Sequence, residues 1–286
     1  MISRNRIYLA AIVLVAVLGT LAGALYVPTL MQPQETNTMT QDASYLGLAE
    51  VFDGKPRMGV STQNVRFGSG TAEAGGFLAQ PVAAGRHPGV IMIHEWWGLN
   101  DQVKSMAHIL AGEGYVVLAV DLFNGKVATS PDEARANIGA NPNNVTLLRL
   151  QAALRYLREL QSVNPDKVGV LGWCYGGGQS FQLGVAEDLQ AVVIFYGSVS
   201  SDPTVLQGLT EPVLGIFGAE DQGIPVASVN SFENALRSLG TSVEIHIYEG
   251  AGHAFANPTN SQAFRKEQAI DAWRLTLAFL QRTLQA

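Results

Sequence analysis

The sequence predicts an α/β fold, in which a mostly parallel β-sheet carries helices on both of its faces. From about Met58 onward, short apolar runs alternate with longer segments of helical periodicity, which is the order of elements in such a fold. Several of the apolar runs have no polar alternation, residues 115–120 most clearly, as is typical of strands buried on both faces. The 286 residues are enough for one large domain.

The first predicted elements form an antiparallel hairpin. Residues 60–67 and 74–80 are predicted strands, and the Gly68-Ser69-Gly70 turn between them is short enough to pair them. The other predicted strands are short apolar runs bounded by turn residues: 90–94, 115–120, 168–171, 191–196, 213–217 and 243–248. Ligands of a sheet of this kind bind at the carboxyl ends of its strands.

The helices are predicted from the spacing of apolar residues and from their end signals. Asp101 is expected to cap a helix that runs to about Glu113 and ends at Gly114. Residues 144–160 carry leucines at helical spacing. The other predicted helices are 131–139, 175–185, 226–239 and 261–284.

The N-terminal residues are set apart from this domain. Arg4 and Arg6 precede an uncharged stretch, residues 7–30, in which Ala22-Gly23-Ala24 has the small residues of a signal-peptide cleavage site. The stretch is also long enough to span a bilayer as an uncleaved anchor, and a buried helix is a third interpretation. We therefore expect residues 1–27 to be a signal peptide or an N-terminal transmembrane helix, and residues 28–57 to be a linker. The folded domain, residues 58–286, would then be exported (periplasmic or extracellular) or anchored to a membrane.

Charge and cysteine content exclude several kinds of partner. The formal net charge is −6, so the chain lacks the basic footprint of a nucleic-acid-binding protein. Membrane contact is expected only through an uncleaved N-terminal segment. Cys174 is the only cysteine, which excludes an intramolecular disulfide and a multi-cysteine metal site. The sequence implies no metal and no organic cofactor.

Cys174 lies in the most informative segment of the chain. Gly172 precedes it by two residues and Gly176 follows it by two, after the apolar run 168–171. This Gly-x-nucleophile-x-Gly spacing predicts a sharp strand–turn–helix elbow that holds a nucleophile in strained backbone. A lone cysteine is otherwise most often an inert buried residue, and the two glycines favour the nucleophile. The helix N-terminus behind the thiol would favour both a thiolate and an oxyanion.

A thiol nucleophile needs a base and a group that orients the base, and two downstream residues are candidates. Asp221 follows the strand at 213–217, and His253 follows the strand at 243–248 in a glycine-rich loop. The order nucleophile, acid, histidine is found in hydrolases with this kind of sheet. Glu220 competes with Asp221, and a solvated acid and a surface histidine are the alternative interpretations.

An oxyanion hole is expected from two backbone N–H groups. One belongs to Tyr175, directly after the nucleophile, and the other to Trp96, in the loop after the strand at 90–94. His94, at the end of that strand, is interpreted as a structural residue.

Four segments together resemble the dienelactone hydrolase family: residues 94–100 (HEWWGLN), 119–123 (AVDLF), 172–177 (GWCYGG) and 252–255 (GHAF). The resemblance covers about residues 58–284 and implies an α/β-hydrolase fold with a Cys-His-Asp triad on Cys174, His253 and Asp221. It also implies a role for Glu95, because a glutamate at this place in the family pairs with the resting thiol and is displaced when substrate binds. A plain structural carboxylate is the alternative for Glu95.

The chain departs from the family where a substrate carboxylate would bind. Members that act on dienelactone carry arginines after the segments matching 119–123 and 252–255, where this chain has Asn124-Gly-Lys126 and Ala256-Asn257. A lysine is not a bidentate carboxylate clamp. We therefore expect an apolar, aromatic-lined pocket beside Trp96 and Tyr175 that includes Trp97, Phe123, Lys126, Trp173, Phe255 and Asn257, with core or lid packing as the alternative for its aromatic members.

These observations predict a hydrolase of small carboxylic esters or lactones, of the carboxymethylenebutenolidase type, with a cysteine nucleophile. A thioesterase or a peptidase would use the same triad. A non-catalytic binding module is the alternative from another class. The expected partner is a small-molecule ester or lactone, and the sequence does not indicate an oligomeric state.

Overall fold

The structure is a computed structural model that describes residues 58–286; the predicted signal peptide or anchor and the predicted linker lie outside the described residues. Eight strands form one sheet in the order β1-β2-β4-β3-β5-β6-β7-β8. The pairs β1–β2 and β2–β4 are antiparallel, and every other pair is parallel. The predicted α/β fold, with its antiparallel N-terminal hairpin, is confirmed.

The strands are β1 (Val60–Phe67), β2 (Ala74–Pro81), β3 (His87–Ile93), β4 (Val116–Asp121), β5 (Val163–Trp173), β6 (Ala191–Phe195), β7 (Val213–Gly218) and β8 (Val243–Tyr248). The helices are α2 (Asp101–Gly112), α3 (Pro131–Ala140), α4 (Asn143–Glu159), α5 (Tyr175–Ala186), α6 (Pro203–Leu206), α7 (Val226–Ser238) and α8 (Lys266–Leu280). A short 3-10 turn (Gly70–Ala72) joins β1 to β2, and a π-helical turn (Gln281–Gln285) follows α8.

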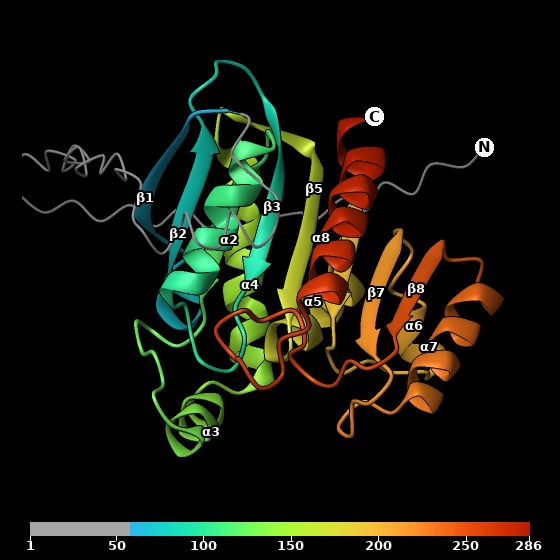
Figure 1. Cartoon of the computed structure of the whole chain (residues 1–286). Helices are drawn as coiled ribbons and strands as arrows, with labels where there is room; N and C mark the ends of the chain where they lie inside the picture. The colour runs from blue at the N-terminus through green and yellow to red at the C-terminus, as the bar shows by residue number, and fades with distance from the viewer. Residues whose placement is uncertain (1–57) are drawn as a thin grey trace, which may run out of the picture. The chain divides into compact units, whose positions relative to one another are not determined.

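Two hydrophobic cores lie on the two faces of the sheet. Helices α2 and α8 cover one face, and α4, α5 and α7 cover the other (Figure 1). Successive residues of β3 point to opposite faces, so Met92 belongs to the first core and Ile93 to the second. Both side chains are fully buried, and such burial contributes about 1.5–3 kcal/mol for each aliphatic side chain.

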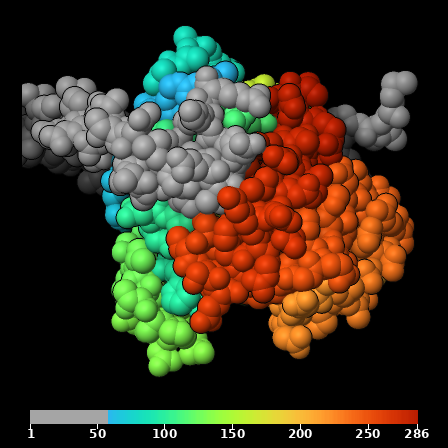
Figure 2. Space-filling model, viewed as in Figure 1, coloured from blue at the N-terminus to red at the C-terminus, as the bar shows by residue number. Residues whose placement is uncertain are grey.

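The C-terminal residues form a continuous band of atoms across the face viewed in Figure 2, where they are drawn in red. Helix α8 and the π-helical turn supply buried residues to the core beneath, among them Trp273 and Leu284. Among the described residues, no helix is both long enough and apolar enough to cross a membrane.

Several elements differ from the sequence prediction: β3 begins at His87 rather than at residue 90, and the short helix α6 was not predicted. Asn100 caps α2 in place of Asp101, because its side chain accepts a hydrogen bond from the N–H of Val103 at 3.1 Å. Strand β5 begins at Val163 rather than at residue 168, since its first residues pair with the start of β3. The last helix begins at Lys266 instead of residue 261.

The late start of α8 has a local cause. The Arg265 side chain donates to the carbonyl of Gly250 at 2.9 Å, and its backbone N–H donates to the carbonyl of Phe255 at 2.9 Å. These bonds hold the segment before α8 in a loop that carries His253 over the end of the sheet.

Candidate active site

Cys174 lies at the turn between β5 and α5, as the elbow spacing predicts. Its backbone has φ 54° and ψ −117°, a conformation that costs on the order of 1–3 kcal/mol for a residue with a side chain. A Cβ on Gly172 would lie 2.3 Å from the carbonyl oxygen of Gly176, and a Cβ on Gly176 would lie 2.4 Å from that of Ile93. Both flanking glycines are therefore required for the strand and the helix to approach this closely.

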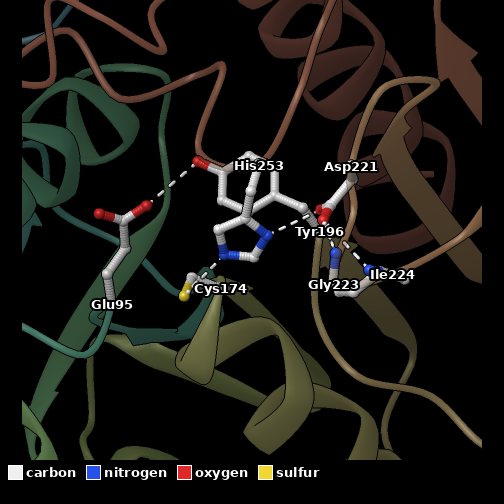
Figure 3. A network of polar contacts seen from close by, with 7 residues as sticks. All are labelled: Glu95, Cys174, Tyr196, Asp221, Gly223, Ile224 and His253. Atoms are coloured by element: carbon white, nitrogen blue, oxygen red, sulfur yellow. Dashed lines mark hydrogen bonds and ion pairs between the residues drawn. The ribbon is translucent and has the colours of Figure 1, made fainter.

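Cys174, His253 and Asp221 form a continuous hydrogen-bonded chain (Figure 3). The His253 Nε2 lies 3.0 Å from the Cys174 Sγ, and its Nδ1 lies 2.7 Å from an Asp221 carboxylate oxygen. With Nδ1 donating to Asp221, Nε2 is free to accept the thiol proton. The predicted nucleophile, base and acid, which come from the ends of β5, β8 and β7, are thus brought together.

Asp221 is fixed by the turn that follows it. Its other carboxylate oxygen accepts the backbone N–H groups of Gly223 at 2.8 Å and Ile224 at 3.1 Å. Its side chain is 1% exposed, whereas the competing Glu220 is exposed to solvent. Burial and three hydrogen bonds orient Asp221 toward His253, so this carboxylate is the one that can hold the imidazole.

Opposing effects act on the Cys174 thiol. Burial and the nearby Glu95 carboxylate raise the pKa of the thiol, whereas the backbone N–H groups of Tyr175 and Trp96 lower it; the net result is a pKa of about 12. Those are the two groups predicted for the oxyanion hole, and both are near enough to favour a negative charge at the sulfur. The thiol is therefore protonated near neutral pH, with donors already in place for an anion.

Glu95 lies on the opposite side of His253 from Asp221 (Figure 3). One oxygen accepts the Tyr196 hydroxyl at 3.3 Å and the other accepts the Asn257 amide at 2.5 Å. Burial raises the pKa of Glu95, and these two hydrogen bonds lower it less. In the described part of the chain no hydrogen bond joins Glu95 to Cys174, so the resting pair implied by the resemblance is not the arrangement here. Tyr196 and Asn257 hold the two carboxylate oxygens instead.

His94 has the structural role expected of it. It is fully buried, its Nδ1 lies 2.5 Å from the carbonyl oxygen of Glu95, and its Nε2 accepts the backbone N–H of Leu122 at 3.2 Å. Burial lowers the pKa of His94. A neutral imidazole thus ties the Glu95–Trp96 loop to the loop after β4 and holds the Trp96 N–H in place.

Two cavities meet at the reactive groups. Both are lined by Trp96, Cys174 and His253. The larger, of about 450 Å³, extends along α5 toward α3 and the loop after β6. The smaller, of about 350 Å³, is bordered by Glu95, Trp97, Ala254 and Asn260. With a substrate carbonyl at Cys174, the parts of the substrate on its two sides could therefore enter different cavities.

The structure places most of the predicted pocket residues elsewhere. Of the aromatic residues expected there, Trp96, Trp97 and Tyr175 are found in the lining. The other three, Phe123, Trp173 and Phe255, are at most 4% exposed and belong to the two cores. Trp173, the last residue of β5, and Phe255 pack in the first core, and Phe123 packs in the second. Lys126 is exposed and lines neither cavity.

Asn257 lines neither of these two cavities. Instead it holds Glu95 by the hydrogen bond described above.

Tyr196 is the principal site residue that sequence reasoning missed. It is fully buried with φ 35°, its hydroxyl donates to Glu95, and its ring meets that of His253 edge-on at 5.3 Å. Its position at the carboxyl end of a predicted strand was the available signal. The larger cavity also has polar lining residues that were not anticipated: Asn143, Gln179, Gln182 and Ser198.

Comparisons with known proteins agree with this geometry. The model of the dienelactone hydrolase family matches residues 74–284. "Protein usf" of Aquifex pyrophilus is 32% identical over 230 residues, which cover 78% of this chain and 99% of that protein. A Bradyrhizobium protein, provisionally named a 2-oxo-3-(5-oxofuran-2-ylidene)propanoate lactonase, is 31% identical over 220 residues, 71% of this chain and 87% of that protein.

A solved structure has the same fold. The protein from Klebsiella pneumoniae, provisionally described as a dienelactone hydrolase, superposes with a TM-score of 0.72 at 24% identity, over 78% of this chain and 99% of that one. The match of the family model to most of the chain, together with these relatives, shows that the protein belongs to the dienelactone hydrolase family.

Proposed function

We propose that the protein hydrolyses small carboxylic esters or lactones with Cys174 as the nucleophile. The observation that carries the proposal is the chain of hydrogen bonds from the Cys174 Sγ through His253 to Asp221, at 3.0 and 2.7 Å. Nucleophile, base and orienting acid at such distances are the minimal requirement for acyl transfer.

In the first half of the reaction, His253 takes the thiol proton as the sulfur attacks the carbonyl carbon. The N–H groups of Trp96 and Tyr175 then stabilise the oxyanion. When the tetrahedral intermediate collapses, the C–O bond breaks and His253 gives its proton to the departing alkoxide. The product of this half is an alcohol and a thioester on Cys174.

In the second half, His253 takes a proton from water, and the hydroxide attacks the thioester. The C–S bond breaks, the carboxylic acid leaves, and the proton returns from His253 to the sulfur. For a lactone, the alcohol and the acid are parts of one product.

Glu95 is proposed to keep the thiol protonated at rest. The support is that its carboxylate lies near enough to raise the pKa of Cys174. When a substrate carbonyl binds between the N–H groups of Trp96 and Tyr175, the Cys174 thiol would give its proton to His253. For the substrate class, the support is the Bradyrhizobium relative, whose printed name is that of a lactonase.

The nucleophile is tested by Cys174→Ala and Cys174→Ser with 4-nitrophenyl acetate as substrate. Cys174→Ala should lower kcat by at least about a thousandfold, because the covalent route is lost. Cys174→Ser should retain weak activity, since a hydroxyl is harder to deprotonate. Unchanged circular dichroism would show that both variants fold. Wild-type turnover by a folded Cys174→Ala protein would refute the mechanism.

We also propose that the domain is exported by its N-terminal segment, with cleavage after Ala24. The support is the basic start, the apolar stretch and the Ala22-Gly-Ala24 sequence. Mass spectrometry of the protein recovered outside the cytoplasm should find a mature chain that begins at Leu25. An intact N-terminus in the membrane fraction would instead show an anchor.

A further inference from the structure

Three consecutive glycines, Gly176 to Gly178, follow Tyr175 in the first turn of α5, and the fold requires only two of them. A Cβ on Gly176 would lie 2.4 Å from the carbonyl oxygen of Ile93, and a Cβ on Gly177 would lie 2.5 Å from that of Phe195. A Cβ on Gly178 would lie 3.6 Å from its nearest neighbour, in the backbone of Ser198, which is an ordinary contact. Glycine destabilises a helix relative to alanine, so packing gives no reason for glycine at this third position.

Gly178 does have a place in the site, because it lines the larger cavity together with Ser198 across from it. A longer side chain at this position would extend into the cavity, one turn of helix beyond Cys174. The missing side chain therefore leaves room for part of a substrate.

The lining of this cavity combines apolar side chains, such as Ile138 and Ile224, with polar ones, and among the described residues it contains no aspartate, glutamate, lysine or arginine. It includes the side chains of Asn143, Gln179, Gln182 and Ser198. The Gln179 amide is held in place by hydrogen bonds with Thr146 at 3.1 Å and Asn143 at 3.2 Å. Amide and hydroxyl groups of this kind recognise neutral hydrogen-bonding groups, such as hydroxyls and carboxamides.

A substrate carboxylate would find no cationic partner among these side chains. Of the described residues that line the two cavities, none is lysine or arginine, and the charged side chain bordering the smaller cavity is the acidic Glu95. A carboxylate buried without a partner cation is costly.

We propose that the cavity opened by Gly178 receives an uncharged, hydrogen-bonding part of the ester, and that esters carrying a carboxylate in that part are rejected. This inference rests on the proposed ester hydrolysis and specifies its substrate class. Gly178 sets the size limit of the cavity, and Gln179 and Gln182 supply its hydrogen bonds.

Charge selectivity is tested with two pairs of substrates on the full chain. Ethyl succinamate and monoethyl succinate differ only in the charge of the acyl part, and the acetate esters of 3-hydroxypropanamide and 3-hydroxypropanoate differ only in the charge of the alcohol part. In the pair whose variable part enters the cavity, the amide should exceed the carboxylate in kcat/KM by at least about tenfold. Carboxylates hydrolysed as well as amides in both pairs would overturn the proposal.

Size selectivity is tested by Gly178→Leu, with Gly178→Ala as a smaller step that packing tolerates. Gly178→Leu should lower kcat/KM for the preferred amide by at least about tenfold more than it lowers kcat/KM for ethyl acetate. The matched control is Gly139→Leu in α3, where a Cβ would meet open space. This variant should leave kcat/KM unchanged for both substrates. An equal loss on both substrates, or no loss in either Gly178 variant, would contradict the assignment.

Gln182→Arg completes the test by adding a cation to the lining. It should bring the carboxylate ester to within about threefold of the amide, and no gain for the carboxylate would count against the inference. The proposed function fails separately: if the wild type hydrolyses neither ethyl acetate nor 4-nitrophenyl acetate, both proposals fall. If it hydrolyses these esters without charge or size selectivity, only the inference about the cavity falls.

Discussion

At the scale of single residues, Glu95 is an acidic side chain that the site buries without a cationic partner among the described residues. Its carboxyl is buried, and its two hydrogen bonds come from the uncharged donors Tyr196 and Asn257. Neither donor neutralises the carboxylate as an arginine would, so burial prevails and the pKa of Glu95 is raised. A buried carboxyl of this kind lowers the stability of the fold as the pH rises.

Replacement of Glu95 by glutamine should make the protein more stable at pH 8, with a smaller effect at pH 5. Well below the ordinary glutamate pKa of 4.5, the carboxyl is protonated in both the folded and the unfolded state and carries little penalty. Above that pH the unfolded chain releases the proton first, so the folded state binds more protons and stability falls until the folded-state pKa is passed. Glutamine does not titrate and escapes this loss, which amounts to about 1.4 kcal/mol for each unit of pKa shift.

Urea unfolding of the wild type and Glu95→Gln at pH 5 and pH 8 measures the difference. A stability difference that is the same at both pH values would contradict the raised pKa of Glu95.

At the scale of elements, the β5–α5 elbow combines strain with close packing. The N–H of Cys174 donates to the carbonyl of Phe195 at 3.0 Å, which fixes the strained residue against the neighbouring strand. The glycines around it let α5 approach β3 and β6 within backbone contact distance. The sharp turn that holds the thiol beside His253 is therefore supported by the layers on which it lies.

The two kinds of glycine in α5 should respond differently to alanine. Gly176→Ala should lower the free energy of unfolding by about 1–3 kcal/mol or more, because its methyl group overlaps the backbone of β3. Gly178→Ala should be neutral or stabilising by up to about 1 kcal/mol, since only helix propensity changes. Denaturant unfolding of both variants gives the comparison. Equal destabilisation by the two substitutions would show that the spacing of α5 from the sheet determines both stability changes, and that local overlap does not.

At the scale of the whole described molecule, the sheet gathers residues that are far apart in the chain. Glu95, Cys174, Asp221 and His253 follow β3, β5, β7 and β8, and all lie at the carboxyl ends of parallel strands. At the other end, the C-terminal turn closes the core: Leu284 is 2% exposed and lies beside Gly169 of β5. The position of the site therefore depends on a core that the last residues of the chain complete.

Leu284→Ala tests that dependence. The loss of a buried leucine side chain should cost about 2–5 kcal/mol of stability, although residue 284 touches neither cavity. Leu239→Ala, at a leucine that is 41% exposed, is the matched control and should stay within about 0.5 kcal/mol. Equal midpoints of thermal unfolding for the two variants would show that the π-helical turn contributes little to the core.

The order of elements, and the three side chains that form one hydrogen-bonded chain at the end of the sheet, could be predicted from the sequence. Each depends on a short pattern: apolar runs for the strands, the glycines around Cys174 for the elbow, and polar residues just after strands for Asp221 and His253. Such patterns act locally, because hydrophobic periodicity and turn chemistry are decided within a few residues.

Only the tertiary structure decided what surrounds those side chains. Phe123, Trp173 and Phe255 are aromatic, as expected of a pocket lining, and yet fill the cores, because the direction of a side chain at or just past the end of a strand depends on the chain that follows and on the layers packed against it. Glu95 takes its partners from residues 101 and 162 positions away, a separation over which no local pattern operates. Short local segments thus determined which side chains reach the end of the sheet. Packing between distant segments determined what surrounds them.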